Sequence, residues 1–334
     1  MKMKGKKMIV KDFYVKPKHY KPRKIIYLLL FAIILSGMLY QGISISLSAK
    51  DYARVGQLLA IDDTLMHVYT GGSGDATFVL ASSIGTPSPY AALSPLHEKL
   101  ASLGKVVVYD KPGYGWSELT KAPRDLDTLT SEIHAILEKS GRQAPYILVA
   151  HSTGSLEMLR FAQRYPEEVS GILLIDGASP SFCRDYNNIM IAESFLLNFS
   201  RHLGILRLGE HLGYFQYALS PNPDLKEDIQ VISKGLALEK LWNRNALEEQ
   251  LRIKNNAEIV LEGGNLGSIP LYFLTSQANI YGNWTKTQQE FFSLSTEAKQ
   301  FVISGSSEQL ERKDLPTILS ACEQLVTFLQ PEEN

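Results

Sequence analysis

Cysteine is scarce in this sequence. Of the 334 residues only Cys183 and Cys322 are cysteines, and seven are histidines. No Cys/His spacing typical of a metal site occurs anywhere, so we expect no metal and no other cofactor. The two cysteines would form a disulfide in an exported domain or remain as two buried thiols, and the sequence leaves both states open.

Beyond the first two dozen residues the chain has no excess of cations. Residues 1–24 hold ten Lys/Arg against Asp12 alone, a formal charge of +9, which leaves −10 on residues 25–334. Nucleic-acid binding usually needs a basic face, so the acidic remainder excludes a nucleic-acid partner.

Charge is absent altogether from residues 25–49. A helix that spans a membrane needs about 20 apolar residues, and this stretch is long enough. We therefore predict a basic cytoplasmic tail at 1–24 and a transmembrane signal-anchor helix at 25–48. The positive-inside rule makes this a single-pass membrane protein with a cytoplasmic N-terminus and an extracytoplasmic domain.

Other interpretations of the apolar stretch stay open. A signal peptide could be cut near Ser46 and Ser48, although its basic region would be unusually long. A buried core helix rarely carries ten flanking cations. The basic tail serves as a topology signal and could also contact anionic lipid.

Polar residues are missing from several short runs in the rest of the chain. We expect buried strands at 77–81, 105–109, 146–150, 171–175, 270–275 and 300–303, preceded by a hairpin of 57–61 and 66–69. Helices are expected at 95–103, 126–140, 155–165 and 315–329. Strands that alternate with helices predict an α/β domain with a mostly parallel sheet covered on both faces.

The alternation stops in the middle of the domain. Residues 180–267 contain no convincing buried strand and read as helices with aromatic and aliphatic stripes. We therefore predict a helical insertion at 180–267, which divides the α/β core into a first part at 55–179 and a second part at 268–330.

The segment Ala150-His151-Ser152-Thr153-Gly154 joins a predicted strand to a predicted helix. Small residues two positions before and after a serine fit the tight strand-to-helix turn called a nucleophile elbow. Such a turn lifts the serine hydroxyl to the top of the sheet and aims backbone N–H groups at the same point. The pattern predicts Ser152 as a nucleophile.

With this motif the chain resembles the α/β-hydrolase family over roughly residues 55–330. The segment Asp110-Lys111-Pro112-Gly113-Tyr114-Gly115-Trp116-Ser117 is similar to the turn that the family carries after the preceding strand, with Lys111 at an arginine position. The resemblance makes Asp110 structural and implies that the helical insertion is the family's cap over the site. The apolar content of this cap suits an apolar small-molecule substrate or ligand.

The resemblance also implies an oxyanion hole. The segment 82–87 follows a strand where the family has its oxyanion loop, with Ser82-Ser83 in place of the usual histidine–glycine pair. The backbone N–H groups of Ile84 and Thr153 are then the expected donors to a developing oxyanion. Backbone donors survive side-chain replacement.

The acid and the base of a catalytic triad are harder to find. The family places them after Ser152 in the order acid, histidine. Asp176 is the one well-placed candidate acid, or else a residue that caps its loop. The expected histidine position holds Gln309, or Glu308 with a one-residue slip, and no histidine follows His211.

Two functions remain in view from the sequence. The first is a serine hydrolase that acts by acyl transfer on an ester, thioester or amide with an atypical base. The second is a catalytically inactive homologue that serves as a membrane-tethered binding or regulatory protein, because loss of the base alone costs several powers of ten in rate.

Overall fold

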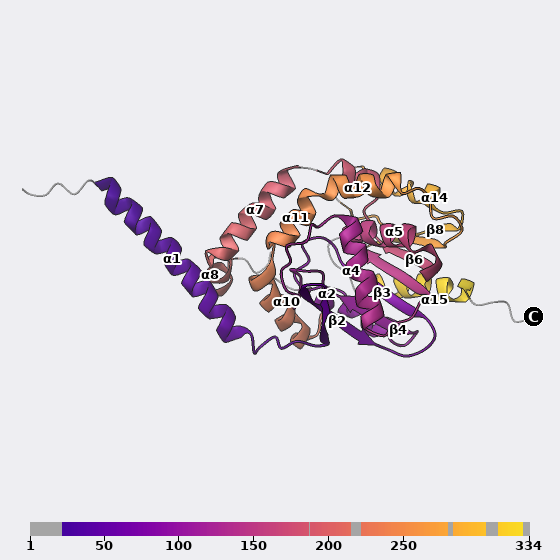
Figure 1. Ribbon diagram of the computed structural model, residues 1–334, viewed down its shortest axis with the longest axis horizontal. Helices are drawn as coiled ribbons and strands as arrows, with labels where there is room; N and C mark the ends of the chain where they lie inside the picture. Colours follow the sequence, from indigo (N-terminus) through magenta and orange to yellow (C-terminus); the bar gives the residue numbers. More distant parts are fainter. Residues whose placement is uncertain (1–21, 187, 215–221, 280–282, 305–312, 330–334) are drawn as a thin grey trace, which may run out of the picture.

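The computed structural model describes residues 22–186, 188–214, 222–279, 283–304 and 313–329. Its first element is the long helix α1 (Pro22–Ser48), which projects from the rest of the molecule (Figure 1). Twenty-seven residues at 1.5 Å per residue make this helix about 40 Å long. Residues 23–48 are apolar and long enough to cross a membrane, as a signal sequence or an anchor helix would.

The described strands form one sheet in the order β1-β2-β4-β3-β5-β6-β7-β8. These strands are β1 (Gln57–Ile61), β2 (Thr64–Gly71), β3 (Thr77–Ala81), β4 (Lys105–Tyr109), β5 (Tyr146–His151), β6 (Val169–Ile175), β7 (Leu271–Ser276) and β8 (Ala298–Ile303). Strand β2 is antiparallel to both β1 and β4, and all later neighbours are parallel. The carboxyl ends of the parallel strands therefore meet at one edge.

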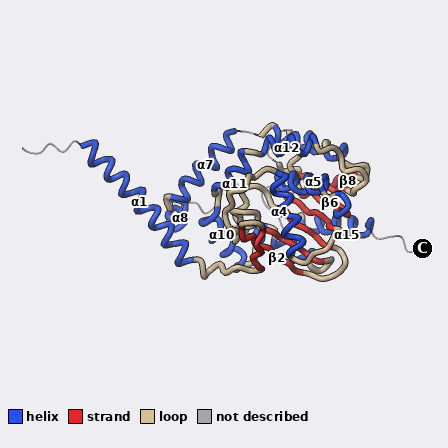
Figure 2. Tube along the Cα trace, in the orientation of Figure 1, coloured by secondary structure: helices blue, strands red, loops and turns tan. Residues whose placement is uncertain are grey.

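Helices cover both faces of this sheet (Figure 2). Those that precede β6 are α2 (Pro89–Ala92), α3 (Ser94–Leu100), α4 (Leu126–Lys139) and α5 (Ser155–Arg164), and those that follow β7 are α13 (Trp284–Gln288), α14 (Phe291–Leu294) and α15 (Leu315–Leu329). Side chains of α4 and α5 pack in one hydrophobic cluster, and those of α3 and α15 pack in a second cluster on the other face. Strands buried on both sides explain the uninterrupted apolar runs.

The helices between β6 and β7 fill the segment that the sequence assigns to the insertion. They are α6 (Pro180–Arg184), α7 (Asn188–His202), α8 (Ile205–His211), α10 (Glu227–Lys240), α11 (Arg244–Leu251) and α12 (Ile253–Glu262). In Figure 1, α7, α8 and α10 lie between α1 and the sheet, whereas α12 lies over the domain near α5. The prediction of a mostly parallel α/β fold with flanking helices is confirmed.

Cys183 and Cys322 are both free thiols in this structure. Each is fully buried, Cys183 in the cluster with α4 and α5, and Cys322 in the cluster on the opposite face. Burial raises the pKa of both thiols, to about 12 for Cys322. Of the two states left open by the sequence, the structure has the unpaired one.

Candidate functional site

Ser152 occupies a strained turn between β5 and α5. Its backbone has φ 52°, in the left-handed region that non-glycine residues rarely adopt. A short 3₁₀ turn, Ser152–Gly154, leads directly into α5. At Gly154 a Cβ atom would lie 2.8 Å from the carbonyl oxygen of Ser82 and 3.1 Å from that of Ala81. The small residue at this position is therefore required by close packing against the end of β3.

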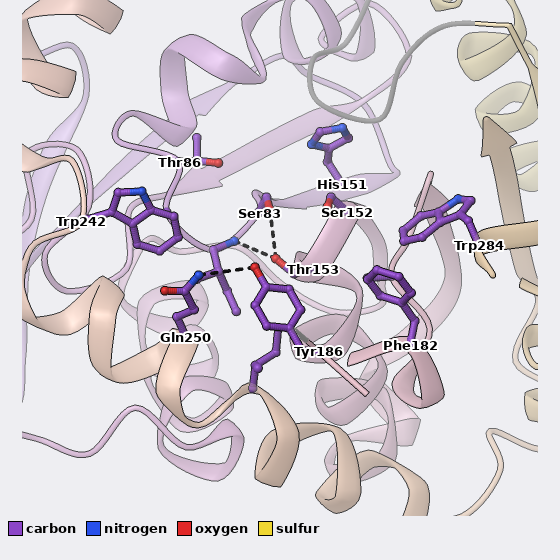
Figure 3. A pocket seen from close by; sticks show the side chains of 14 residues that line it. Ser83, Thr86, His151, Ser152, Thr153, Phe182, Tyr186, Trp242, Gln250 and Trp284 are labelled. Carbon is purple, nitrogen blue, oxygen red and sulfur yellow. Dashed lines mark hydrogen bonds between the residues drawn. The ribbon is translucent and has the colours of Figure 1, made fainter. Parts of the chain in front are cut away.

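The half-buried Ser152 opens on a cavity of about 300 Å³ at the carboxyl edge of the sheet. The lining residues come from the oxyanion loop, the elbow, the cap and the segment after β7: Ser83, Ile84, Gly85, Thr86, His151, Ser152, Thr153, Ala178, Phe182, Tyr186, Trp242, Gln250, Ile253 and Trp284. In Figure 3 the aromatic side chains of Phe182, Tyr186, Trp242 and Trp284 stand around the serine. The cavity is thus largely apolar, with hydroxyl groups gathered at its floor.

The predicted oxyanion donors are not equally available. The Ile84 N–H donates to Thr153 Oγ1 at 2.8 Å, and Thr153 Oγ1 lies 2.9 Å from Ser83 Oγ (Figure 3). A side-chain hydroxyl therefore occupies the Ile84 amide that a substrate oxygen would use. Ile84 and Thr153 are both predicted from the sequence. That the Thr153 hydroxyl accepts the Ile84 N–H is visible only in the structure.

Asp176 lies at the end of β6 and is almost fully buried. One of its oxygens accepts from the Ser276 N–H at 2.9 Å and from Trp284 Nε1 at 2.7 Å, and the other accepts from Asn279 Nδ2 at 3.2 Å. Two residues further on, the Ala178 N–H donates to the Ser152 carbonyl at 2.9 Å. The candidate acid is thus fixed among loops at the same edge of the sheet, beside the strand that carries Ser152.

The base remains the open member of the triad. Glu308 and Gln309, the residues at the predicted histidine position, lie outside the described residues. Within the described part of the chain no hydrogen bond reaches Ser152 Oγ. His151 lines the same cavity, and in Figure 3 its imidazole projects from the position next to Ser152 in the chain. His151 is not among the residues that the sequence predicts for the site, yet it lines the cavity.

Other described histidines are engaged away from the cavity. The buried His67 contacts Asp110 through Nδ1 at 2.7 Å, which agrees with the structural role expected of Asp110. Burial lowers the pKa of His97 to about 4, and its Nε2 lies 3.2 Å from the Tyr90 carbonyl oxygen. His202 is an exposed cap residue whose Nδ1 lies 2.9 Å from the Asn198 carbonyl oxygen.

A buried ionic cluster behind the cavity was not predicted. The Lys111 ammonium contacts both Glu157 of α5 and Glu249 of α11. Tyr109 donates to Glu157 at 2.9 Å, and Tyr114 donates to Glu249 at 2.8 Å. We call these five residues the Lys111 cluster.

The Lys111 cluster joins the cap to the oxyanion loop. Tyr114, which donates to Glu249 of the cap, also accepts from the Gly85 N–H at 3.2 Å. Burial and then the neighbouring Glu249 raise the pKa of Glu157 to about 7, although Lys111 opposes the rise. In the sequence, Lys111 stands out because it occupies the family's arginine position. No feature of the sequence identifies Glu157 or Glu249 as its partners.

Comparisons with known proteins agree with this architecture. The family model described as "alpha/beta hydrolase fold" matches residues 96–314, about two thirds of the chain. The uncharacterized protein YbdG of Bacillus subtilis is 34% identical over 165 residues, which cover 48% of this chain and 51% of YbdG. The chain thus spans about half the length of that relative.

A more distant relative has a described activity. The pimeloyl-[acyl-carrier protein] methyl ester esterase of Shewanella woodyi is 27% identical over 197 residues, 58% of this chain and 72% of the esterase. Among solved structures, Cfl2 of Burkholderia cenocepacia has a TM-score of 0.60 at 19% identity, covering 82% of this chain and 95% of that one.

The enol-lactonase of Burkholderia xenovorans has a TM-score of 0.57 at 16% identity, covering 82% of this chain and 99% of that one. Identities this low show the shared fold alone. The family model, in contrast, extends over the elbow turn, the cap helices and the later strands. On this evidence the chain belongs to the α/β-hydrolase family.

Proposed function

We propose that this protein is a serine hydrolase that transfers an acyl group from an ester, thioester or amide to water, with Ser152 as the nucleophile. The observation that carries the proposal is the left-handed backbone of Ser152 at the mouth of an apolar cavity. Such strain costs about 1–3 kcal/mol and persists where the surrounding structure enforces it, commonly at active sites. A serine that only filled a turn would gain nothing from this conformation.

The chemistry assigns a role to each group around the serine. Ser152 Oγ attacks the carbonyl carbon and its proton passes to a base, which gives that proton to the leaving alcohol, thiol or amine as the tetrahedral intermediate collapses to an acyl-enzyme. Water, deprotonated by the same base, then attacks the acyl-enzyme, and the carboxylic acid departs as the proton returns to Ser152 Oγ. The N–H groups of Thr153 and Ile84 stabilise the oxyanion, the second only after the Thr153 hydroxyl has turned away from it. Asp176, at the same edge of the sheet, is the residue that we assign to orient the base.

The base in this mechanism is atypical. His151 supports the assignment best among the described residues, because its imidazole lines the same cavity as Ser152. An imidazole suits proton transfer near neutral pH. Glu308, at the predicted histidine position, is the second candidate, but a solvated carboxylate is poorly matched to a serine proton.

The substrate that fits this cavity has an apolar acyl or alcohol part. Aromatic side chains from the cap and from the segment after β7 surround the serine, and a volume of about 300 Å³ admits a small molecule. Similarity to a pimeloyl-[acyl-carrier protein] methyl ester esterase supports an ester as the first substrate class to test.

A second function is favoured by specific observations. No histidine follows His211, and the Ile84 amide is occupied by Thr153. Both features suit a catalytically inactive homologue that uses the cavity to bind an apolar ligand or to regulate a partner.

A fluorophosphonate probe separates the two functions. A serine hydrolase is labelled at Ser152 and turns over p-nitrophenyl esters, whereas Ser152→Ala abolishes both. Ser155→Ala is the matched control, because Ser155 is a neighbouring buried serine whose hydroxyl donates to the Ala178 carbonyl. If the wild-type protein is not labelled, yet binds an apolar fluorescent ester saturably, the inactive homologue is correct.

We also propose that α1 is an uncleaved signal anchor with residues 1–24 in the cytoplasm and the hydrolase domain outside. The ten cations before the apolar helix support this orientation. Protease added to intact cells should remove the domain and leave the tail protected. Release of the domain into the medium without protease would instead show that α1 is a cleaved signal peptide.

A further inference from the structure

The cap carries an exposed apolar surface next to α1. Its large apolar side chains are Phe195, Leu196 and Phe199 of α7, Ile205 and Leu208 of α8, and Leu212 and Tyr214 immediately after α8, each at least 44% exposed. The α7 residues fall at positions i, i+1 and i+4, and the later residues continue the stripe at 205, 208 and 212. These side chains come from two helices joined by the turn at Leu203 and Gly204, and we call the seven residues together the α7–α8 face.

The turn at Leu203 and Gly204, which we call the α7–α8 corner, is in direct contact with α1. A Cβ atom at Gly37 would lie 2.3 Å from the Leu203 carbonyl oxygen, and one at Gly204 would lie 2.9 Å from the Tyr40 ring. Two glycines therefore let the backbones of the two segments meet. Close approach through small residues is typical of helix packing in membranes.

Polar contacts hold the same part of α1 against the cap. Gln41 is 5% exposed, and its amide donates to the Leu238 carbonyl at 2.7 Å and accepts from Arg207 Nε at 3.2 Å. In the segment that follows α1, the Tyr52 hydroxyl donates to Glu239 of α10 at 3.0 Å. The cap is therefore attached to α1 as well as to the core.

The position of the corner along α1 sets its depth in a bilayer. A hydrocarbon core that begins at Ile25 ends about 20 residues later, near Ser44. Gly37 lies seven residues before that end, which at 1.5 Å per residue is about 10 Å. Amphipathic helices in the interface sit about 5–10 Å deep, so the α7–α8 corner is at the depth of such a helix.

The direction of α7 agrees with this depth. In Figure 1, α7 runs transverse to α1 and not parallel to it. If α1 crosses a bilayer, α7 therefore extends along the plane of that bilayer. The large apolar side chains of α1 from Ile25 to Tyr40 are 40–68% exposed and continue the apolar surface. The acidic groups nearby are Glu193, exposed on α7, and Glu210, which pairs with Lys234.

From this continuity we infer that the α7–α8 face of the cap is immersed in the membrane interface on the side of the bilayer that holds the domain. The inference depends on the proposed anchorage through α1. The partner is the lipid surface itself, because the apolar face adjoins a helix of membrane-spanning length and carries few charges. The cap of the cavity would then be a membrane-bound element.

Depth-dependent fluorescence quenching tests this inference on the full chain. Single cysteines at Leu196→Cys and Leu208→Cys are labelled with an environment-sensitive dye and reconstituted into phosphatidylcholine–phosphatidylglycerol vesicles that contain nitroxide-labelled lipid. Cys183 and Cys322 are buried, and the unsubstituted chain measures their background. Ile33→Cys in α1 is the positive control, and Ser102→Cys, exposed on the far side of the core, is the negative control.

We expect lipid nitroxides near the headgroups to quench the labels at 196 and 208 strongly, and the label at 102 not at all. Replacing Phe199 and Leu212 together by serine should reduce quenching at 196, whereas serine at the exposed core residues Leu119 and Val302 should not.

Three results would overturn the inference and are distinguishable. Quenching of the label at 33 but not of those at 196 or 208 would mean that α1 is in the bilayer and that the α7–α8 face is not. Unquenched labels at 196 and 208 that crosslink between chains would mean that a second copy covers the face. No quenching at 33 would mean that α1 itself is not in the bilayer.

Discussion

Replacing Lys111 by methionine tests the cluster that holds the cap to the core. Methionine keeps most of the volume and removes the charge. Glu157 and Glu249 would then face each other in a buried site with only Tyr109 and Tyr114 as donors. Removing one partner of a buried ion pair costs about 3–5 kcal/mol, because the remaining charge is left without compensation.

The loss of stability in Lys111→Met should depend on pH, and the direction of this dependence follows from the ionisation of Glu157. Burial and the charge of Glu249 raise the pKa of this carboxyl to about 7 in the folded protein, above its usual value of 4.5. A group with a raised folded pKa binds its proton more tightly in the folded state, so it stabilises most at low pH and loses that contribution as pH rises toward 7. Without the Lys111 ammonium, the repulsion between the ionised carboxylates of Glu157 and Glu249 is uncompensated. Lys111→Met should therefore be most destabilising above about pH 7, where both carboxyls are ionised.

Thermal unfolding in detergent, followed by tryptophan fluorescence at about pH 5 and about pH 8, measures the effect. In domains of 150–250 residues each kcal/mol corresponds to about 2–4 °C, so a loss of at least about 6 °C is expected at the higher pH. Lys226→Met is the matched control, because its ammonium pairs with Glu98 at an exposed site and should shift the melting temperature little. Equal losses at both pH values, or none at pH 8, would refute this account of the cluster.

Three further outcomes are expected. Gly154→Ala places a Cβ atom 2.8 Å from the Ser82 carbonyl oxygen, so it should lower stability by about 1–3 kcal/mol and reduce fluorophosphonate labelling; unchanged melting and labelling would contradict the packing argument. Thr153→Val removes the hydroxyl that accepts from Ile84 and should speed labelling of Ser152, whereas Thr153→Ser should not; slower labelling in the valine variant would mean that the hydroxyl assists the reaction. Glu157→Gln removes a carboxyl whose pKa is raised to about 7, so the melting temperature should decline less than that of wild type from about pH 4.5 to pH 7; parallel melting profiles would show that Glu157 does not titrate there.

The sheet was readable from the sequence because its strands have almost no polar residues. Runs such as Thr77–Ala81 and Lys105–Tyr109 coincide with β3 and β4, which are buried by helices on both faces. Strand ends were less accurate. Strand β2 was expected at 66–69 and extends over Thr64–Gly71, because both of its edges are paired, with β1 and with β4.

The elbow was also readable, since its small residues and its strand-helix context lie within a few positions of one another. The contacts that modify the site were not. Ile84 and Thr153 meet through a side-chain rotamer, and Lys111 meets Glu249 across 138 positions of sequence. No periodicity or local motif encodes contacts of this kind, because they depend on how segments far apart in the sequence pack against one another.

The backbone of the site is left-handed at two neighbouring turns. Ser152 at φ 52° and Asp176 at φ 43° are both left-handed non-glycine residues, and they end the neighbouring strands β5 and β6. Each conformation costs about 1–3 kcal/mol and persists only where the surrounding structure enforces it.

The Ala178-to-Ser152 backbone hydrogen bond ties the two turns together, so the strain is shared by one rigid edge. What catalysis still requires is a proton acceptor, and of the described residues around the cavity only His151 carries an imidazole. If His151→Gln suppresses labelling of Ser152 as fully as Ser152→Ala does, while the melting temperature is unchanged, the nucleophile and its base are adjacent residues. Full labelling of His151→Gln would move the base to the segment that contains Glu308.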